Sequence, residues 1–356
     1  MLIALAEGQL IDALYAARSR HYVCPACHQP VNLRHGTRVQ PHFAHRAKQR
    51  CTVVSEGETR QHIQGKRQLS LFFQSWGPVT LERIIPEIAQ RADCWIQRPE
   101  KAPVAIEFQC SPITTAQVLA RTRGYRRQAT YPFWILGQRY CQYGVSWSLI
   151  ERFATRLRGW GLSLLFWDVR RHQLRIDHHI CQDALGNYHW RTTWIRRLAQ
   201  LEAGNQMPLP RVSLDYSRWR SRLARDLRVK NAGVLAVQER LYAAGHHILD
   251  VPACLTTKTA TLPIFGQGLL LWRALVISQL FAGPVTWISR QMVERAGRQS
   301  FETVGGHRHA VWFTGDQAVI TAQRELLLEL TAQGYLRVAH DGWQIQRWPT
   351  WGIIRK

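Results

Sequence analysis

Residues 1–33 alternate between apolar and polar positions and are interrupted by turns. Apolar runs at 1–5 and 10–15 flank a turn at 7–9, and a further short run at 22–23 follows. Alternating runs separated by a glycine-containing turn predict β-hairpins. A β-rich unit this small buries little apolar surface, so we expect it to need another stabilising element, such as a bound metal.

The pattern changes between residues 56 and 136. Glu58, His62 and Lys66 recur at every fourth position, which places them on one face of a helix predicted over 56–73. Further along, the sequence predicts strands at 79–88, 93–97 and 104–110, a helix at 115–127 and a last apolar strand at 131–136. The predicted order of elements is therefore α-β-β-β-α-β, which indicates an α/β fold.

A proline-containing segment, 204–210, separates this region from a second one. Beyond it, helices are predicted at 217–230, 268–281, 287–295 and 322–333, and strands flank a turn at 340–342. A helix followed by a tight hairpin is typical of a winged helix, although plain α+β cores contain the same order of elements. We therefore predict three domains: a β-rich unit at 1–55, a central domain at 56–205 and a mostly helical C-terminal domain at 206–356.

The composition adds a strong basic bias. Lys and Arg total 47 against 24 acidic residues, which gives a formal net charge of +23. So many positive side chains repel one another in a compact chain unless a polyanion is present, so nucleic acid is the favoured partner. A membrane surface would also attract this charge, but we find no lipid anchor or strongly amphipathic end.

The sequence also bears on the cellular compartment. Its first residues lack a basic start before an apolar run, and its longest apolar stretch, 269–281, is interrupted by Arg273 and is short for a membrane span. We therefore expect no membrane association and a cytoplasmic location.

A cluster of cysteine and histidine residues indicates a zinc site. Fourteen residues separate Cys24-Pro25-Ala26-Cys27 from His42-Phe43-Ala44-His45, and Cys51 follows. A Cys-x-x-Cys knuckle places two thiolates on one metal, and a downstream His or Cys pair completes a tetrahedron around Zn²⁺. We take Cys24, Cys27 and His45 as ligands and leave the fourth open between His42 and Cys51. Four protein ligands would make the zinc structural, whereas an open position would permit catalysis.

Acidic residues on the predicted strands could bind a second metal. Asp93 begins one strand and Glu107 lies on the next, where Gln109 shares its face because side chains alternate along a strand. Phosphodiester hydrolysis needs carboxylates that converge on a cation such as Mg²⁺, which activates water and neutralises charge on the phosphate. Each residue taken singly is also compatible with an ordinary solvated side chain. The candidate catalytic set is completed by three residues of the preceding helix, Glu58, His62 and Lys66.

Several motifs occur in order along the chain, namely the Cys-Pro-x-Cys knuckle, the tetrad 42–45, Glu58/His62/Gly65-Lys66, Arg91-Ala92-Asp93, Ile106-Glu107-Phe108-Gln109-Cys110-Ser111, Arg121-x-x-x-Tyr125 and Trp134-Ile135-Leu136-Gly137. Together these motifs resemble the competence protein CoiA family, over about residues 20–140. The resemblance implies a restriction-endonuclease-like fold of the PD-(D/E)xK type and a role in natural transformation, in which incoming single-stranded DNA is processed or recombined. It implies that Asp93 and Glu107 bind Mg²⁺ or Mn²⁺ and that Glu58 assists.

One position departs from the superfamily pattern. Gln109 stands where lysine is usual, and its neutral amide can neither supply positive charge nor act as a base. Lys66 or His62 on the neighbouring helix could substitute, which would make the protein a Mg²⁺-dependent deoxyribonuclease. Otherwise the fold would be a degenerate nuclease that binds single-stranded DNA as a recombination accessory. A zinc-containing transcription regulator would explain the charge but not the acidic residues.

Two groups of residues are candidate DNA contacts. Arg121 and Tyr125 lie one helical turn apart and would face the DNA strand, while Arg218, Arg222 and Arg225 share one face of the predicted helix 217–230. Phosphate contacts of this kind bind without reading base sequence. Solvated surface residues are the alternative for each group. Recombination proteins are a further expected class of partner.

Overall fold

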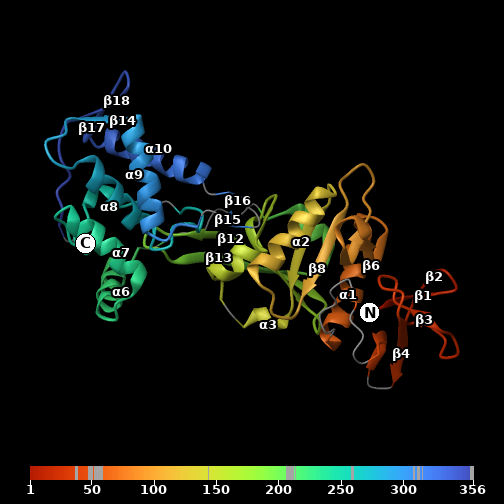
Figure 1. Ribbon diagram of the computed structural model, residues 1–356. Coiled ribbons are helices and arrows are strands. Elements are labelled where there is room, and N and C mark those ends of the chain that lie inside the picture. Colours follow the sequence, from red (N-terminus) through yellow and green to blue (C-terminus); the bar gives the residue numbers. More distant parts are fainter. Residues whose placement is uncertain are drawn as a thin grey trace. The chain divides into compact units, whose positions relative to one another are not determined.

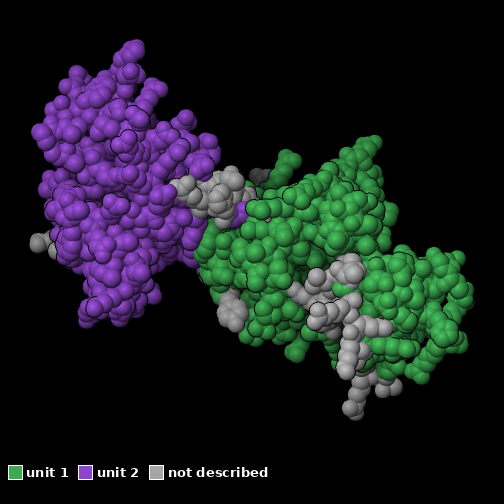
Figure 2. All heavy atoms as spheres, viewed as in Figure 1, with its two compact units in different colours: residues 1–178, 192–206 green, residues 179–191, 207–356 purple. Residues whose placement is uncertain are grey.

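The computed structural model describes two compact units. The described residues are 1–36, 39–46, 51, 59–142, 144–205, 212, 214–257, 260–307, 309–310, 313–314 and 316–352. The first unit comprises residues 1–178 with 192–206, and the second comprises residues 179–191 with 207–356 (Figure 2). The linker at 204–210 predicts that residues 179–191 belong to the central domain. The structure places this segment in the second unit, because Ala184 and Leu185 are buried in that unit's core.

The chain begins with a five-stranded antiparallel sheet in the order β2-β1-β3-β4-β5. Figure 1 labels β1 to β4 of this sheet, near the N-terminus. Its core is small and is formed mainly by Tyr22, Val31 and Phe43, as the short alternating pattern predicts. The β1–β2 turn needs a left-handed backbone, which Gly8 adopts with φ of 77°. The strands are β1 (Ile3–Ala6), β2 (Gln9–Asp12), β3 (Tyr22–Val23), β4 (Pro30–Gly36) and β5 (Val39–His45).

The rest of the first unit is built around an eight-stranded mixed sheet. Part of β12 and part of β13 belong to the second unit. The strand order of this sheet is β13-β12-β11-β9-β8-β7-β6, with β10 paired to β11. From Arg60 to Leu136 the elements follow the predicted order, namely α1 (Arg60–Phe73), β6 (Val79–Ile85), β7 (Gln90–Ile96), β8 (Val104–Gln109), α2 (Thr115–Arg127) and β9 (Tyr131–Leu136). Next come α3 (Gln138–Cys141), α4 (Trp147–Phe153), β10 (Thr155–Leu157), β11 (Gly161–Asp168), β12 (Gln173–Gln182), β13 (Tyr188–Ile195) and α5 (Leu198–Ala203).

Helices α1 and α2 cover opposite faces of this sheet. Leu69 of α1 belongs to the same apolar cluster as Ile106 and Phe108 of β8, whereas Tyr125 of α2 packs with Ala105. Successive residues of a strand point to opposite faces, so β8 lies between the two helices. Each helix begins at a threonine, Thr59 or Thr114, whose hydroxyl accepts a backbone N–H of the first turn. Side chains on both faces of β8 are therefore covered by a helix, and all six of its residues are buried.

The second unit is mostly helical and is built around α8. Every residue of α8 except Gln279 is buried, and the one charge within it, Arg273, pairs with Glu329 of α10 at 2.5 Å. A buried charge needs such a partner, which explains how an arginine interrupts the apolar run. The elements are α6 (Tyr216–Arg228), α7 (Ala232–Ala243), α8 (Leu269–Leu280), β14 (Trp287–Ser289), α9 (Arg290–Thr303), β15 (His309–Ala310), β16 (Phe313–Thr314), α10 (Asp316–Ala332), β17 (Leu336–Ala339) and β18 (Gly342–Ile345).

The hairpin predicted after the last helix is present as β17 and β18, and β14 adds a third strand in the order β14-β18-β17. None of the described helices combines the length and the apolar character that a membrane span requires.

Candidate metal centre and nuclease-like site

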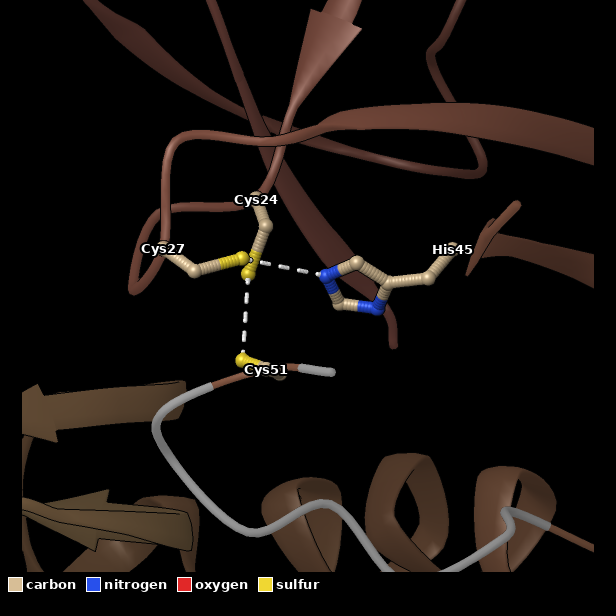
Figure 3. Close-up of side chains that lie close together, drawn as sticks. All are labelled: Cys24, Cys27, His45 and Cys51. Carbon is tan, nitrogen blue, oxygen red and sulfur yellow. Dashed lines mark hydrogen bonds between the residues drawn. The ribbon is translucent and has the colours of Figure 1, made fainter. Parts of the chain in front are cut away.

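Three cysteines and one histidine converge in the N-terminal sheet. Cys24 and Cys27 lie in the turn between β3 and β4, His45 ends β5, and Cys51 approaches from further along the chain (Figure 3). Their ligand atoms all lie within 4.8 Å of one another. Cys24 Sγ is 3.9 Å from Cys51 Sγ, and Cys27 Sγ is 3.3 Å from His45 Nε2.

This donor set fits zinc. Zn–S bonds of ~2.3 Å at tetrahedral angles give S···S separations of about 3.8 Å, close to that between Cys24 and Cys51. Burial raises the pKa of the Cys24 thiol to about 11 and lowers the pKa of His45. A divalent cation would favour the thiolate that binds it.

The sequence left two candidates for the fourth ligand, His42 and Cys51, and Cys51 is the one that lies with the other three residues. His42 lies apart from the cluster, with Nδ1 2.9 Å from the carbonyl oxygen of Gln40. The reason is local, because His42 and His45 are three residues apart on β5 and side chains alternate along a strand. His42 was therefore a wrong candidate for this cluster.

A second constellation lies where β7 and β8 meet α1 and α2. Asp93, Glu107 and Gln109 are only 7%, 5% and 6% exposed, and all three line a cavity of about 260 Å³. His62 and Arg121 line the same cavity. The structure therefore brings together five residues from four elements that the sequence singled out.

Asp93 is held from three directions. His62 Nε2 lies 3.1 Å from Asp93 Oδ2, the Phe108 backbone N–H donates to the same oxygen at 2.8 Å, and Lys66 Nζ lies 4.0 Å from Oδ1. Burial alone would raise the pKa of Asp93, but His62, Lys66 and the Phe108 N–H together lower it. The carboxylate is therefore ionised and fixed in orientation.

Lys66 is fully buried and forms an ion pair with Glu82, a residue that sequence reasoning missed. Leu81 pairs with Cys94 and Arg83 with Ala92, so Glu82 lies opposite Asp93, with a left-handed φ of 54°. If the register of the β6–β7 hairpin had been known, the position of Glu82 opposite Asp93 would have marked Glu82 as a candidate site residue.

Glu82 also connects the site to the N-terminal sheet. Its Oε2 accepts the backbone N–H groups of Leu2 at 2.8 Å and Ile3 at 3.2 Å. Burial would raise the pKa of Glu82, but Lys66, Arg91 and the N-terminal ammonium hold it well below its usual range. One carboxylate thus fixes both Lys66 and the start of β1.

Glu107 binds two side chains of α2. Arg121 Nη2 donates to Glu107 Oε1 at 2.5 Å and to the Arg91 carbonyl at 3.1 Å, and the Tyr125 hydroxyl donates to the same Glu107 oxygen. Burial raises the pKa of Glu107, although Arg121 opposes the shift. Tyr125 is 0% exposed, so the expectation that it faces a DNA strand is wrong. Arg121 remains at the wall of the cavity.

Both constellations fall within matches to known protein domains. Residues 7–54 match the family model described as Competence protein CoiA, N-terminal domain, and residues 58–200 match Competence protein CoiA, nuclease-like domain. The chain belongs to the CoiA family. It is similar to Competence protein CoiA of Bacillus subtilis (strain 168), with 34% identity over 122 residues that cover 34% of this chain and 32% of the relative. That match spans about a third of the length of either protein. No solved structure matches the chain.

The CoiA nuclease-like domain offers oxygen ligands for a divalent cation. Asp93 Oδ1 and Glu107 Oε2 accept no hydrogen bond from the residues that the structure describes, although the other oxygen of each carboxylate is bonded. Carboxylate oxygens are ligands that Mg²⁺ and Mn²⁺ prefer. One oxygen of each carboxylate is thus held by protein donors, and the other could serve as a cation ligand, although Asp93 Oδ1 also lies 4.0 Å from Lys66 Nζ.

The remaining candidate residues differ in their positions in the CoiA chain. Glu58 falls outside the described residues. Gln109 Nε2 donates to the Ser111 carbonyl at 2.7 Å, which fixes its amide at the cavity wall. Three further candidates lie on α6 in the second unit and take no part in this site, namely Arg218, Arg222 and Arg225.

Proposed function

We propose that this CoiA family member is a Mg²⁺- or Mn²⁺-dependent deoxyribonuclease that acts on DNA, mainly single-stranded, during natural competence. The observation that carries the proposal is the pair of buried carboxylates, Asp93 and Glu107, that line one cavity of the nuclease-like domain. A PD-(D/E)xK type of core fits the order α1-β6-β7-β8-α2-β9. Buried carboxylates that share one cavity are costly unless they serve a site.

The residues of the cavity have separable roles in this proposal. Asp93 and Glu107 hold the cation, which would activate water and offset charge on the scissile phosphate. His62 and the Phe108 N–H orient Asp93, and Tyr125 with Arg121 orients Glu107. Lys66, 4.0 Å from Asp93, supplies the positive charge that the amide of Gln109 lacks. Glu58 remains a proposed assisting residue.

A second candidate is a degenerate nuclease that binds single-stranded DNA without cutting it and assists recombination proteins. Gln109 and the ion pair between Lys66 and Glu82 favour it, since Lys66 is already neutralised by a buried carboxylate. The two candidates share DNA binding and differ in cleavage alone.

The decisive experiment incubates the full-length protein with labelled single- and double-stranded DNA in Mg²⁺, Mn²⁺ or chelator. Asp93→Asn and Glu107→Gln keep the side-chain shape, and Glu100→Gln, at an exposed turn residue, is the matched control. We expect the wild type and Glu100→Gln to cleave DNA only when metal is present. We expect Asp93→Asn and Glu107→Gln not to cleave it. Binding without cleavage under every metal would favour the recombination accessory instead.

We also propose that Cys24, Cys27, His45 and Cys51 hold one structural zinc, because four protein ligands close the coordination sphere. The metal would supply the stability that the small core of the N-terminal sheet lacks. Elemental analysis should find one zinc per chain in wild type and in His42→Ala, and less than one in Cys51→Ala. Equal zinc in both variants would contradict the ligand set.

For the second unit, we propose a winged-helix arrangement formed by α8, β14, α9, α10, β17 and β18. Its supporting feature is the hairpin directly after α10, with β14 as the third strand. Recombination proteins are the class of protein partner proposed for it.

A further inference from the structure

The second unit contains a separate cavity of about 680 Å³, lined by α6 and by the connection between β12 and β13. Ligand-binding pockets commonly fall between 300 and 1,000 Å³, so this volume is far larger than one inorganic ion needs and suits a nucleotide-sized group. Its lining includes four arginines of α6 and two polar side chains of the 183–189 segment; the six residues are Arg218, Arg222, Arg225, Arg228, Asn187 and His189.

The positive charge of this cavity wall is only partly offset by acidic residues nearby. Among the described residues, neither Arg218 nor Arg228 forms an ion pair, and Arg225 contacts only the adjacent Asp226, at 3.4 Å. The one buried acid beside the cavity, Asp183, already accepts four hydrogen bonds of 2.9 Å. Asp215 caps α6 through the backbone N–H of Arg218. Four arginines line the cavity against two carboxylates, Asp183 and Asp215, so the wall keeps an excess of positive charge that attracts an external anion.

Part of the wall is already fixed in place. Arg222 donates to the Leu185 carbonyl at 2.6 Å and to Asn187 Oδ1 at 3.2 Å. Asp183 holds His189 through Nε2, and the ring remains 27% exposed. Burial lowers the pKa of Arg222, and repulsion from Arg225 and Arg218 adds to the shift while Asp226 and Asp183 oppose it. Ordered groups lose less entropy when they bind a ligand.

We propose that this arginine-lined cavity binds the phosphate groups of a nucleic-acid strand. Guanidinium forks bind phosphate oxygens in pairs, and Arg218 and Arg225 lie two helical turns apart, about 10 Å, so the wall reaches more than one phosphate. The site goes beyond the proposed nuclease, because all of its residues belong to the second unit. The phosphate chain of a free nucleotide shares this chemistry, and the experiment below separates the two sources.

The test measures equilibrium binding of a labelled oligo-dT by the full-length protein in an Asp93→Asn background, where cleavage cannot interfere. Arg218→Ala with Arg225→Ala should weaken binding about 10-fold and reduce the slope of log K against log salt by about 1.4, two contacts at ~0.7 each. The matched control, Arg240→Ala with Arg295→Ala, removes the same charge from exposed positions of the same unit outside the cavity. Equal weakening by both pairs would show a net-charge effect alone and overturn the site.

A second comparison leaves the charge unchanged. Ser217 and Ser221 are both exposed on α6, but only Ser221 lines the cavity. Ser221→Trp should therefore obstruct binding, and Ser217→Trp should not. No loss in Ser221→Trp would contradict the proposal. The protein could instead bind ATP more tightly than oligo-dT and lose that affinity equally in the Arg218→Ala/Arg225→Ala variant. That result would show that a free nucleotide, and not a nucleic-acid strand, is the ligand. A protein that cuts no DNA at all would refute the nuclease and leave this binding test intact.

Discussion

Lys66 links the nuclease-like site to the N-terminal sheet through Glu82. It is fully buried, pairs with Glu82 and lies 4.0 Å from Asp93, while Glu82 binds the backbone of Leu2 and Ile3. A buried ion pair adds little net stability, but removal of one partner leaves the other charge buried and unpaired. The same side chain thus serves folding and, in our proposal, catalysis.

Lys66→Met should lower the free energy of unfolding by about 3–5 kcal/mol, because Glu82 would remain buried as a lone charge. Adding Glu82→Gln should restore part of the loss, since a neutral amide still accepts the N–H groups of β1. Urea unfolding of full-length protein measures both. Lys101→Met, at an exposed position, is the control. A double variant no more stable than Lys66→Met would argue against the ion pair as the cause.

The ion pair also predicts how stability responds to acid. The folded pKa of Glu82 lies well below its usual 4.5, so its contribution is present above pH 4.5 and is lost as the pH falls towards the folded value. Glu82→Gln cannot titrate. Its stability should be lower than wild type at pH 7, and the difference should shrink as the pH drops below about 4.5. Unfolding free energies measured across this range decide the point, and a constant difference would refute it.

At the scale of elements, α1 and β8 pack so closely that one glycine is required. A Cβ added at Gly65 would lie 2.0 Å from Cε1 of Phe108, the residue between Glu107 and Gln109. Replacement of a helical glycine by alanine normally stabilises a helix by about 1 kcal/mol. At Gly65 the contact with Phe108 reverses the sign of this effect, so that alanine destabilises the protein.

Gly65→Ala should therefore destabilise the protein by about 1–3 kcal/mol, because Phe108 has to move within a packed core. Gly36→Ala is the matched control, since a Cβ at that strand position meets nothing within 4 Å. Thermal unfolding of the two variants measures the difference. If Gly65→Ala proved as stable as wild type, β8 would be less tightly held against α1 than the structure indicates.

The elements also show which parts of the molecule the sequence could predict. The ranges 115–127 and 131–136 coincide with α2 and β9, because local periodicity and a threonine cap define them. The sequence left the fourth zinc ligand open between His42 and Cys51, and treating 42–45 as a strand would have disfavoured His42, because His42 and His45 then point to opposite faces. Glu82 was not recognisable, since its burial depends on Lys66 and on backbone groups 79 and 80 residues away.

At the scale of the whole molecule, the second unit is completed by a segment from the middle of the chain. Residues 179–191 supply Ala184 and Leu185 to its core, and Gln182 pairs with Thr261 in an isolated bridge. The Leu270 N–H donates to the Ala184 carbonyl at 2.8 Å. A boundary drawn from the linker near 204–210 separates this segment from the core that it fills.

A fragment of residues 207–356 should consequently be unstable by itself, because removal of 179–191 exposes the apolar groups that Leu185 covers and frees the backbone partner of Leu270. We expect a low unfolding temperature and binding of an apolar dye. A synthetic peptide of residues 179–191 should raise that temperature in a concentration-dependent manner, since it binds the folded state alone. The same peptide with Leu185→Asp should not, because it would bury an unpaired carboxylate. A fragment that melts as cooperatively and as high without the peptide as with it would show that 207–356 folds independently of this segment.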